Sequence, residues 1–127
     1  MYAQCRRSES GCDIQNLLEA IDMRGFRMII RIWHGATPAA KSDEYLNLMR
    51  TVAIPDYRST PGNKGACALR RIEGDTAHFL MITFWESEEA IRAFAGDDIS
   101  AAKYYGFDKD FLLELEPRST HYEMYDT

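Results

Sequence analysis

Three histidines, His34, His78 and His121, are the residues of this chain best suited to proton transfer at neutral pH. An imidazole gains and loses its proton near neutrality, so a histidine beside a bound molecule can act as a general base or proton shuttle. Three converging imidazoles, with Glu123 on the same face as His121, could instead hold a metal ion. Histidines that simply pack at the rim or in the core of the domain are the other interpretation. If one histidine is catalytic, we prefer His34 or His121, and we expect no metal site.

Arg31 carries a charge in the middle of an apolar run, between Ile30 and Ile32. A charge that is removed from water needs a compensating partner. If both faces of this strand are covered, the partner is either a buried carboxylate such as Glu123 or an anionic ligand.

Aromatic side chains could form the wall of an apolar binding site. Such rings combine a large apolar surface with an N–H or O–H group that can orient a ligand. The two tryptophans also fit the simpler role of core residues at strand ends, and the two tyrosines could either pack against the core or form a lid. The residues concerned are Trp33, Trp85, Tyr104 and Tyr105.

Hydrophobic periodicity predicts four strands and two main helices that position these residues. Thr37 and Pro38 are typical of a helix start, and Pro55 is typical of its end. The expected elements are a strand at 27–34, a helix at 38–53, hairpin strands at 65–72 and 76–85 joined through Gly74, a helix at 88–95 between Ser87 and Gly96, a short helix at 99–106 capped by Asp98, and a strand at 119–125.

The order of these elements predicts a ferredoxin-like βαββαβ fold of the α+β class, with one antiparallel sheet and both helices on one face. The first strand then lies between the third and the fourth, which brings His34, His78 and His121 to one end of the sheet. Apolar residues occupy odd and even positions of the first and third strands, so the second sheet face should be buried too. An identical sheet is the simplest cover, and we expect a homodimer.

The domain is expected to span residues 27–127, after an N-terminal extension at 1–26 with a possible short helix between Asp13 and Gly25. The 15 basic and 20 acidic residues give a net charge of −5, which disfavours nucleic acid as a partner. No apolar run approaches the roughly 20 residues that cross a bilayer, and no secretory signal is recognised. We therefore expect no membrane association and a cytoplasmic location.

Three segments of the chain follow one another in an order that is typical of one family. They are MIIRIWHG at 28–35, TPGNKGACALRRIEGD at 60–75 and FLMITFWESEEAIRAFAGDD at 79–98. In these segments the chain resembles the antibiotic-biosynthesis monooxygenase family, and the resemblance covers about residues 28–125. It implies a dimeric α+β barrel that acts as a cofactor-independent monooxygenase on a small phenolic or aromatic compound, so no cofactor is expected.

The resemblance also suggests which residues hold the substrate. Haem-degrading relatives use an Asn on the first strand and a Trp and a His after the third; here those later positions fall near Phe94 and Tyr104, and the first strand has no Asn. Quinone-forming relatives instead bind a phenol, favour its anion and let the ring react with dioxygen. On that basis the candidates are Trp33, Trp85, Phe94 and Tyr105 for substrate binding, and Arg31, His34, His121 and Tyr104 for catalysis.

Two other functions remain open. The protein could be a non-catalytic small-molecule binding or accessory protein whose pocket only sequesters a hydrophobic ligand. It could also be a cofactor-free isomerase that uses His34 or His121 as a proton shuttle. Nucleotide-dependent, zincin and serine-hydrolase functions are not supported, because the sequence contains none of their motifs.

Overall fold

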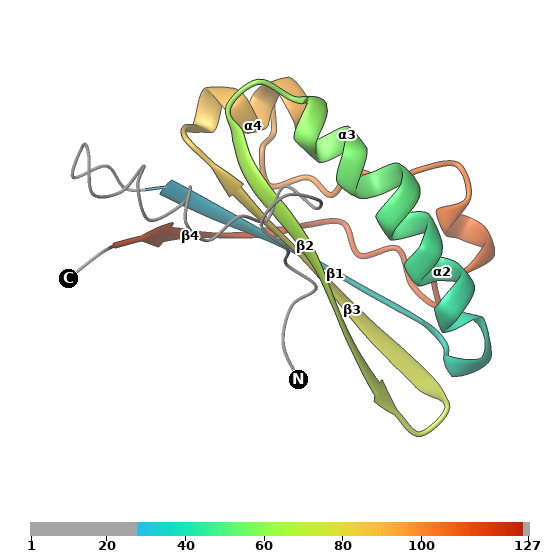
Figure 1. Cartoon of the computed structure of the whole chain (residues 1–127). Coiled ribbons are helices and arrows are strands. Elements are labelled where there is room, and N and C mark those ends of the chain that lie inside the picture. The colour runs from blue at the N-terminus through green and yellow to red at the C-terminus, as the bar shows by residue number, and fades with distance from the viewer. Residues whose placement is uncertain (1–27, 126–127) are drawn as a thin grey trace.

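The computed structural model describes residues 28–125 (Figure 1), and the helix expected between Asp13 and Gly25 lies outside the described residues. The described chain folds into four strands and three helices. Their bounds are β1 (Met28–Pro38), α2 (Ser42–Leu48), a π-helical turn (Met49–Ala53), α3 (Ile54–Ser59), β2 (Asn63–Glu73), β3 (Thr76–Trp85), α4 (Glu88–Ala95) and β4 (Thr120–Met124), with 3-10 turns at Ala39–Lys41 and Asp108–Asp110.

The four strands form one antiparallel sheet in the order β2-β3-β1-β4. Figure 1 shows α2, α3 and α4 together on one side of this sheet. The α+β class, the element order and the place of the first strand between the third and fourth are therefore confirmed.

Short-range signals gave the hairpin and the second main helix correctly. Gly74 turns between β2 and β3 with a φ of 60°, a value that glycine adopts without strain. The hydroxyl of Ser87 accepts a hydrogen bond from the backbone N–H of Ala90 at the start of α4, and Gly96 follows its end with a φ of 97°.

The predicted helix start at Thr37 is wrong, because β1 continues to Pro38. Thr37 is fully buried and pairs with Ala77 of β3, and its hydroxyl donates to the carbonyl of Pro38 instead of capping a helix. A proline at the end of a strand breaks no ladder bond that the sheet needs. Tertiary pairing with β3 thus outweighs the local capping signal.

The predicted helix end at Pro55 is also wrong, since helical structure continues to Ser59. The chain passes through a π-helical turn just before the proline, in which the N–H of Ile54 donates to the carbonyl of Met49, five residues earlier. Proline in a regular α-helix lacks one donor and collides with the carbonyl four residues before it. The wider turn leaves room for the ring of Pro55.

Residues 96–119, here called the covering segment, lack the short helix that was expected at 99–106. Asp98 caps no helix, because its carboxylate accepts hydrogen bonds from the backbone N–H and the hydroxyl of Ser100. Beyond it the chain doubles back on itself, and Ala101 forms an isolated antiparallel bridge with Arg118. Aromatic and aliphatic side chains of this segment pack against the core.

The two faces of the sheet differ in their cover. Odd-numbered residues of β1 and β3, such as Trp33 and Phe79, are buried against the helices and form the core. Even-numbered residues point to the other side, where Ile32, Leu80 and Phe84 are half-buried and Met28, at the start of β1, is fully buried. This second surface, here called the open face, is as apolar as the sequence predicted.

Candidate active site

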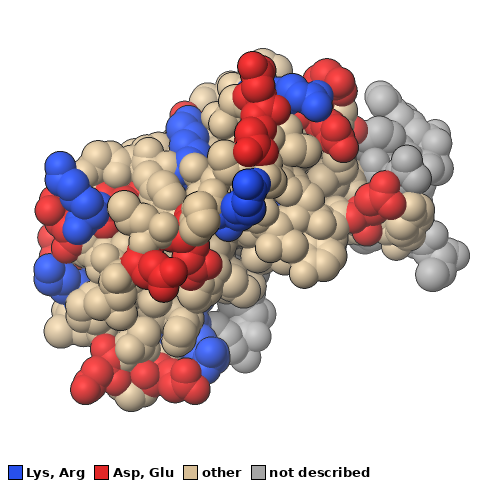
Figure 2. All heavy atoms as spheres, turned by 180° about the vertical axis from the view of Figure 1, so that it is seen from behind, with Lys and Arg blue, Asp and Glu red and all other residues tan. Residues whose placement is uncertain are grey.

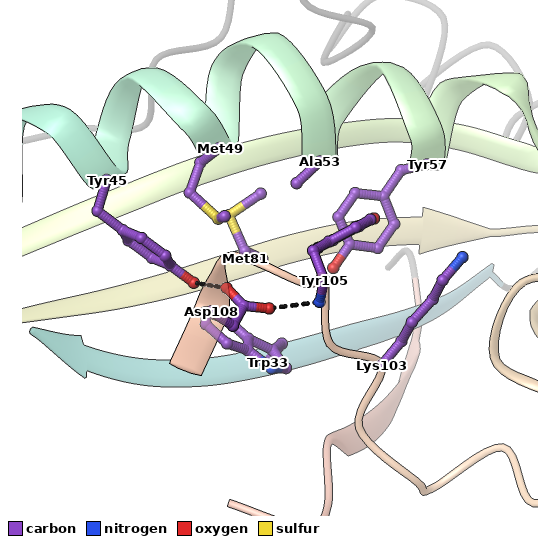
Figure 3. A pocket seen from close by; sticks show the side chains of 9 residues that line it. All are labelled: Trp33, Tyr45, Met49, Ala53, Tyr57, Met81, Lys103, Tyr105 and Asp108. Atoms are coloured by element: carbon purple, nitrogen blue, oxygen red, sulfur yellow. Dashed lines mark hydrogen bonds between the residues drawn. The ribbon is translucent and has the colours of Figure 1, made fainter. Parts of the chain in front are cut away.

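A small pocket lies between the sheet, the helices and the covering segment (Figure 3). Its enclosed space is about 10 Å³, room for one water molecule, and the hollow reaches about 190 Å³ when its open mouth is included. The helices supply Tyr45, Met49, Ala53 and Tyr57, the sheet supplies Trp33 and Met81, and the covering segment supplies Lys103, Tyr105 and Asp108. The pocket is aromatic, small and open to solvent on one side.

Asp108 brings a carboxylate into this aromatic pocket, and it is 2% exposed. Figure 3 shows its two hydrogen bonds: Oδ1 accepts from the hydroxyl of Tyr45 at 2.7 Å, and Oδ2 accepts from the backbone N–H of Tyr105 at 2.6 Å. Burial raises the pKa of Asp108, although both hydrogen bonds act in the opposite direction. A buried carboxyl of raised pKa in a pocket is typical of a general base.

Two tyrosines beside Asp108 are held in the neutral form. Burial raises the pKa of Tyr45, and the hydrogen bond to Asp108 raises it further. Burial likewise raises the pKa of Tyr105, whose hydroxyl donates to Asp56. Both phenols therefore remain hydrogen-bond donors over the whole working range of pH.

Asp56 on α3 fastens the covering segment to the helices. Its Oδ2 accepts from the hydroxyl of Tyr105 at 2.6 Å and from Nζ of Lys103 at 3.0 Å. Burial alone would raise the pKa of Asp56, but the hydrogen bonds from Tyr105 and Lys103 outweigh it and hold that pKa below its ordinary value. The Lys103 ammonium also lies 4.2 Å from the centre of the Phe94 ring.

Arg31 lies two residues before Trp33 on the same face of β1, beside the pocket. It is 1% exposed, its Nη2 donates to the carbonyl of Ala101 at 2.7 Å, and its guanidinium carbon lies 5.6 Å from the centre of the Phe94 ring. Burial lowers the pKa of Arg31. In the sheet it faces His121 and not the expected Glu123, which lies opposite Ile29 and is exposed.

The four predicted aromatic residues take different places. Trp33 and Tyr105 line the pocket, whereas Tyr104 packs edge-on against Trp33 at 6.2 Å between ring centres. Trp85 is fully buried behind the pocket, and its indole N–H donates to the hydroxyl of Thr83. Trp85 therefore lies in the core, the simpler of the two roles considered for it.

Phe94, proposed as a substrate-binding residue, also belongs to the wall behind the pocket. Its ring stacks on that of Tyr57 at 4.5 Å and lies 5.7 Å from the ring of Trp85. Its contacts are with Arg31 and Lys103 on one side and with aromatic core residues on the other.

The structure separates the three histidines. His34 and His78 both lie on the open face: Nε2 of His34 is 3.2 Å from Nδ1 of His78, and Nδ1 of His34 is 2.5 Å from Oε2 of Glu116. His121 shares the helix face with Arg31, directly opposite it in the ladder. Within residues 28–125 no group of three or more His, Cys, Asp or Glu side chains is arranged to hold a metal ion.

Sequence reasoning missed the residues that give the pocket its polarity. Asp108 stands in a polar, aperiodic stretch where nothing marks one aspartate as buried, and Tyr57 follows the proline taken as a helix end. One signal could have indicated this wall of the pocket, namely the four-residue spacing of Tyr45, Met49, Ala53 and Tyr57. That spacing places the four residues on one helix face only if the helix continues beyond Pro55.

The surface carries both signs of charge. Figure 2 shows Lys and Arg side chains scattered among Asp and Glu on the face seen there, without one large basic patch. In the part of the chain that the structure describes, no helix is long and apolar enough to span a membrane.

An antiparallel βαββαβ sheet with its helices on one face and an aromatic pocket beneath them defines a ferredoxin-like α+β domain. The chain belongs to the antibiotic biosynthesis monooxygenase family, whose model matches residues 25–102, more than half of its length. It is also similar in fold to the crystal structure of a proposed antibiotic biosynthesis monooxygenase from Bacillus cereus, with a TM-score of 0.50 and 16% identity over 80% of this chain and 94% of that one. No curated protein matched the chain.

These comparisons confirm the family resemblance. Membership of the family suggests a function of the monooxygenase type. The structural likeness, at 16% identity, concerns the fold.

Proposed function

We propose that this protein is a cofactor-independent monooxygenase that oxidises a small phenolic or aromatic compound in the pocket beneath the covering segment. The observation that carries the proposal is Asp108, a buried carboxyl of raised pKa among aromatic rings in a member of this family. Asp108 would take the phenolic proton, and the resulting electron-rich phenolate ring would react with dioxygen.

The aromatic residues would hold the substrate ring. Trp33 from the sheet and Tyr105 from the covering segment offer flat apolar surfaces, and Tyr45 holds the base in place through its hydroxyl. Because the enclosed space is about 10 Å³, the covering segment has to move outward when a ring binds. The hydrogen bonds from Lys103 and Tyr105 to Asp56 would break in this movement.

The reaction balances without a cofactor for a phenol that carries a ring CH₂ group. The CH₂ group loses its two hydrogens, one atom of O₂ becomes the new carbonyl oxygen, and the other atom leaves as water. The substrate thus supplies all four electrons.

A non-catalytic binding protein is the second candidate, and the small size of the pocket favours it. A small enclosed space with every oxygen of Asp108 already hydrogen-bonded suits a protein that traps a ligand as well as one that transforms it. An isomerase would have to use His121, because His34 lies on the open face.

The experiment is incubation with a hydroxyanthrone under ¹⁸O₂, with mass spectrometry of the product. One labelled carbonyl oxygen per product and one O₂ consumed are expected. Binding without oxygen uptake would favour the binding protein, and turnover in the absence of oxygen would favour the isomerase. Asp108→Asn serves as the variant that lacks the base, and Tyr122→Phe, at an exposed tyrosine, is the control.

We also propose that two copies pack through their open faces to form a dimeric α+β barrel. The support is the apolar character of that face, where Ile32, Leu80 and Phe84 are half-buried in the single chain. Packing a second sheet there would remove these side chains from water.

A further inference from the structure

We propose that Arg31 and His121 form a subsite for the carboxylate of an aromatic acid whose ring occupies the adjacent pocket. The inference names a substrate class and rests on the proposed function only in using the same pocket. It does not depend on whether the bound compound is oxidised.

The guanidinium of Arg31 is buried without a counter-charge from the described residues. It is 1% exposed, and within residues 28–125 no carboxylate lies at ion-pair distance from it. Its Nη2 donates to the carbonyl of Ala101, but its Nε is buried without an acceptor among the described residues. An arginine in this state retains donors and charge that water cannot reach and that none of residues 28–125 neutralises.

The neighbours of Arg31 explain why this charge stays uncompensated. Its partners across the sheet are Thr83 on β3 and His121 on β4. The hydroxyl of Thr83 is already engaged, because it donates to the carbonyl of Arg31 and accepts from the indole of Trp85. The remaining contact is the face of the Phe94 ring, which attracts a cation but accepts no strong hydrogen bond.

His121 provides a second unsatisfied nitrogen beside the first. Its Nε2 is buried and has no partner among the described residues. Burial lowers the pKa of His121 and the charge of Arg31 lowers it further, while the carboxylate of Glu88 acts in the opposite direction; the net effect favours the neutral imidazole. Residues directly opposite in an antiparallel ladder have Cα atoms roughly 5 Å apart, so the two side chains can reach one small group together.

A carboxylate fits these donors. Its two oxygens match the planar fork of a guanidinium, and one oxygen can also accept from an imidazole N–H. One full positive charge and one neutral ring balance a monoanion, whereas a phosphate dianion would lack a second cation. Lys103, the nearest other cation at the Phe94 ring, is already paired with Asp56.

The subsite lies beside the pocket. Arg31 and Trp33 share one face of β1 two residues apart, and the positive charge of Arg31 acts on Tyr57 and Tyr105, which both line the pocket. The Ala101 carbonyl that Arg31 holds belongs to the covering segment, so the movement that admits a ring also frees this end. A ligand with its ring against Trp33 would place its acid group toward Arg31.

The test is calorimetric titration of the full chain with salicylate and with salicylamide, which replaces the carboxylate by a neutral amide. We expect salicylate to bind at least about tenfold more tightly, the range of one hydrogen-bonded charge pair. Acetate, a carboxylate without a ring, is expected to bind more weakly than either. Equal affinity for salicylate and salicylamide, or no measurable binding of salicylate, would overturn the subsite, and equal affinity for acetate and salicylate would overturn its aromatic specificity.

Variants separate recognition from a structural role. Arg31→Met should abolish the preference for salicylate, and Arg31→Lys should keep part of it. Arg70→Met is the matched control, since Arg70 lies on the same sheet face but is paired with Asp43 at 2.7 Å, and it should keep the full preference. If Arg31→Met does not fold, the affinities of the native chain and of Arg31→Lys for salicylate and salicylamide still test the carboxylate subsite.

A spectroscopic measurement gives an independent readout. Salicylate should move the titration of the His121 imidazole to higher pH in the native chain, because a bound anion favours the protonated ring, and salicylamide should not. An unchanged His121 titration on salicylate binding would contradict a shared site. Because binding is measured without turnover, a protein that binds salicylate but oxidises no phenol would refute the proposed function and leave the subsite standing.

Discussion

The hydroxyl of Tyr45 on α2 donates a hydrogen bond of 2.7 Å to Oδ1 of Asp108 on the covering segment. Both residues are buried, and the bond joins two elements that are 63 residues apart in the chain. The principal helix and the covering segment are thus tied together at the pocket itself.

Removal of this hydroxyl should destabilise the protein. Tyr45→Phe leaves one oxygen of a buried carboxylate without a donor, and we expect a loss of about 1–3 kcal/mol in the free energy of unfolding. Urea denaturation followed by tryptophan fluorescence measures it. Tyr122→Phe, at a tyrosine that is 56% exposed, is the control and should stay within about 0.5 kcal/mol of the native chain.

Replacement of Asp108 should change both activity and the pH dependence of stability. Asp108→Asn removes the proposed base, and we expect kcat to fall by about 100-fold or more. Because burial raises the pKa of Asp108, its contribution to stability is fully present below its unfolded pKa and is lost as pH rises through the folded value. Urea unfolding at several pH values should therefore show the variant gaining stability relative to the native chain as pH rises, and the opposite trend would contradict this assignment.

Loss of the Tyr105 hydroxyl should loosen the covering segment. Tyr105→Phe removes one of the two donors that hold Asp56, so amide hydrogen exchange should become faster across residues 99–112 and stay unchanged in β2 and β3. The pKa of Asp56 is lower in the folded chain than in the unfolded chain. The hydrogen bonds from Tyr105 and Lys103 to its carboxylate are therefore intact above the pKa of the unfolded chain, and they are lost as pH falls through the pKa of the folded chain. The protection of these amides in the native chain, corrected for the intrinsic pH dependence of exchange, should fall in that acidic window. A variant with native exchange rates would show that Lys103 alone is sufficient.

The histidine pair on the open face should show one defined proton arrangement. With its Nδ1 proton donated to Glu116, His34 has Nε2 free to accept from Nδ1–H of His78. For the neutral form of the His34 ring, we expect ¹⁵N NMR to show the proton on Nδ1 and not on Nε2. Glu116→Gln should disturb this arrangement, and a protonated Nε2 on His34 in the native chain would refute it.

An acidic substitution on the open face should produce monomers. Leu80→Asp places a charge where we propose that the second copy packs, so light scattering should show half the native mass. Ile72→Asp, at a β2 position that is 53% exposed and faces the helix side, is the control and should keep the native mass. A native chain that is already monomeric at working concentration would refute the dimer.

The sequence predicted those parts of the fold that local physics decides. Gly74 sets the hairpin turn, Ser87 and Gly96 bound α4, and alternating apolar residues identify β1 and β3, all without reference to distant contacts. Thr37 and Pro55 gave a wrong helix start and a wrong helix end, because the conformation of each depends on tertiary contacts. The strand partner of Thr37 lies 40 residues away, and the π-helical turn before Pro55 has no local sequence signal.

The site was less predictable than the fold. Trp33 and His34 are adjacent, so the strand register sends one into the pocket and the other to the open face, and no composition argument could decide between them. The role of Asp108 could not be predicted, because its partners come from distant parts of the chain. Tyr45 and the backbone of Tyr105 meet only after the covering segment has folded over the helices. Aperiodic segments carry no pattern from which such a meeting can be inferred.

The π-helical turn at Met49–Ala53 also fixes the angular phase of the pocket wall. In a regular α-helix, each step of four residues rotates a side chain by about 40°, so three steps from Tyr45 would carry Tyr57 roughly 120° away from it. The wide turn takes back part of that rotation in the middle step. The wide turn acts as a one-residue insertion, so Tyr57 lies in phase with Tyr45 as the eleventh residue of a regular helix would, only about 20° away. If the turn tightened to ordinary helical pitch without loss of a residue, the full rotation of about 120° would return and swing Tyr57 out of the wall.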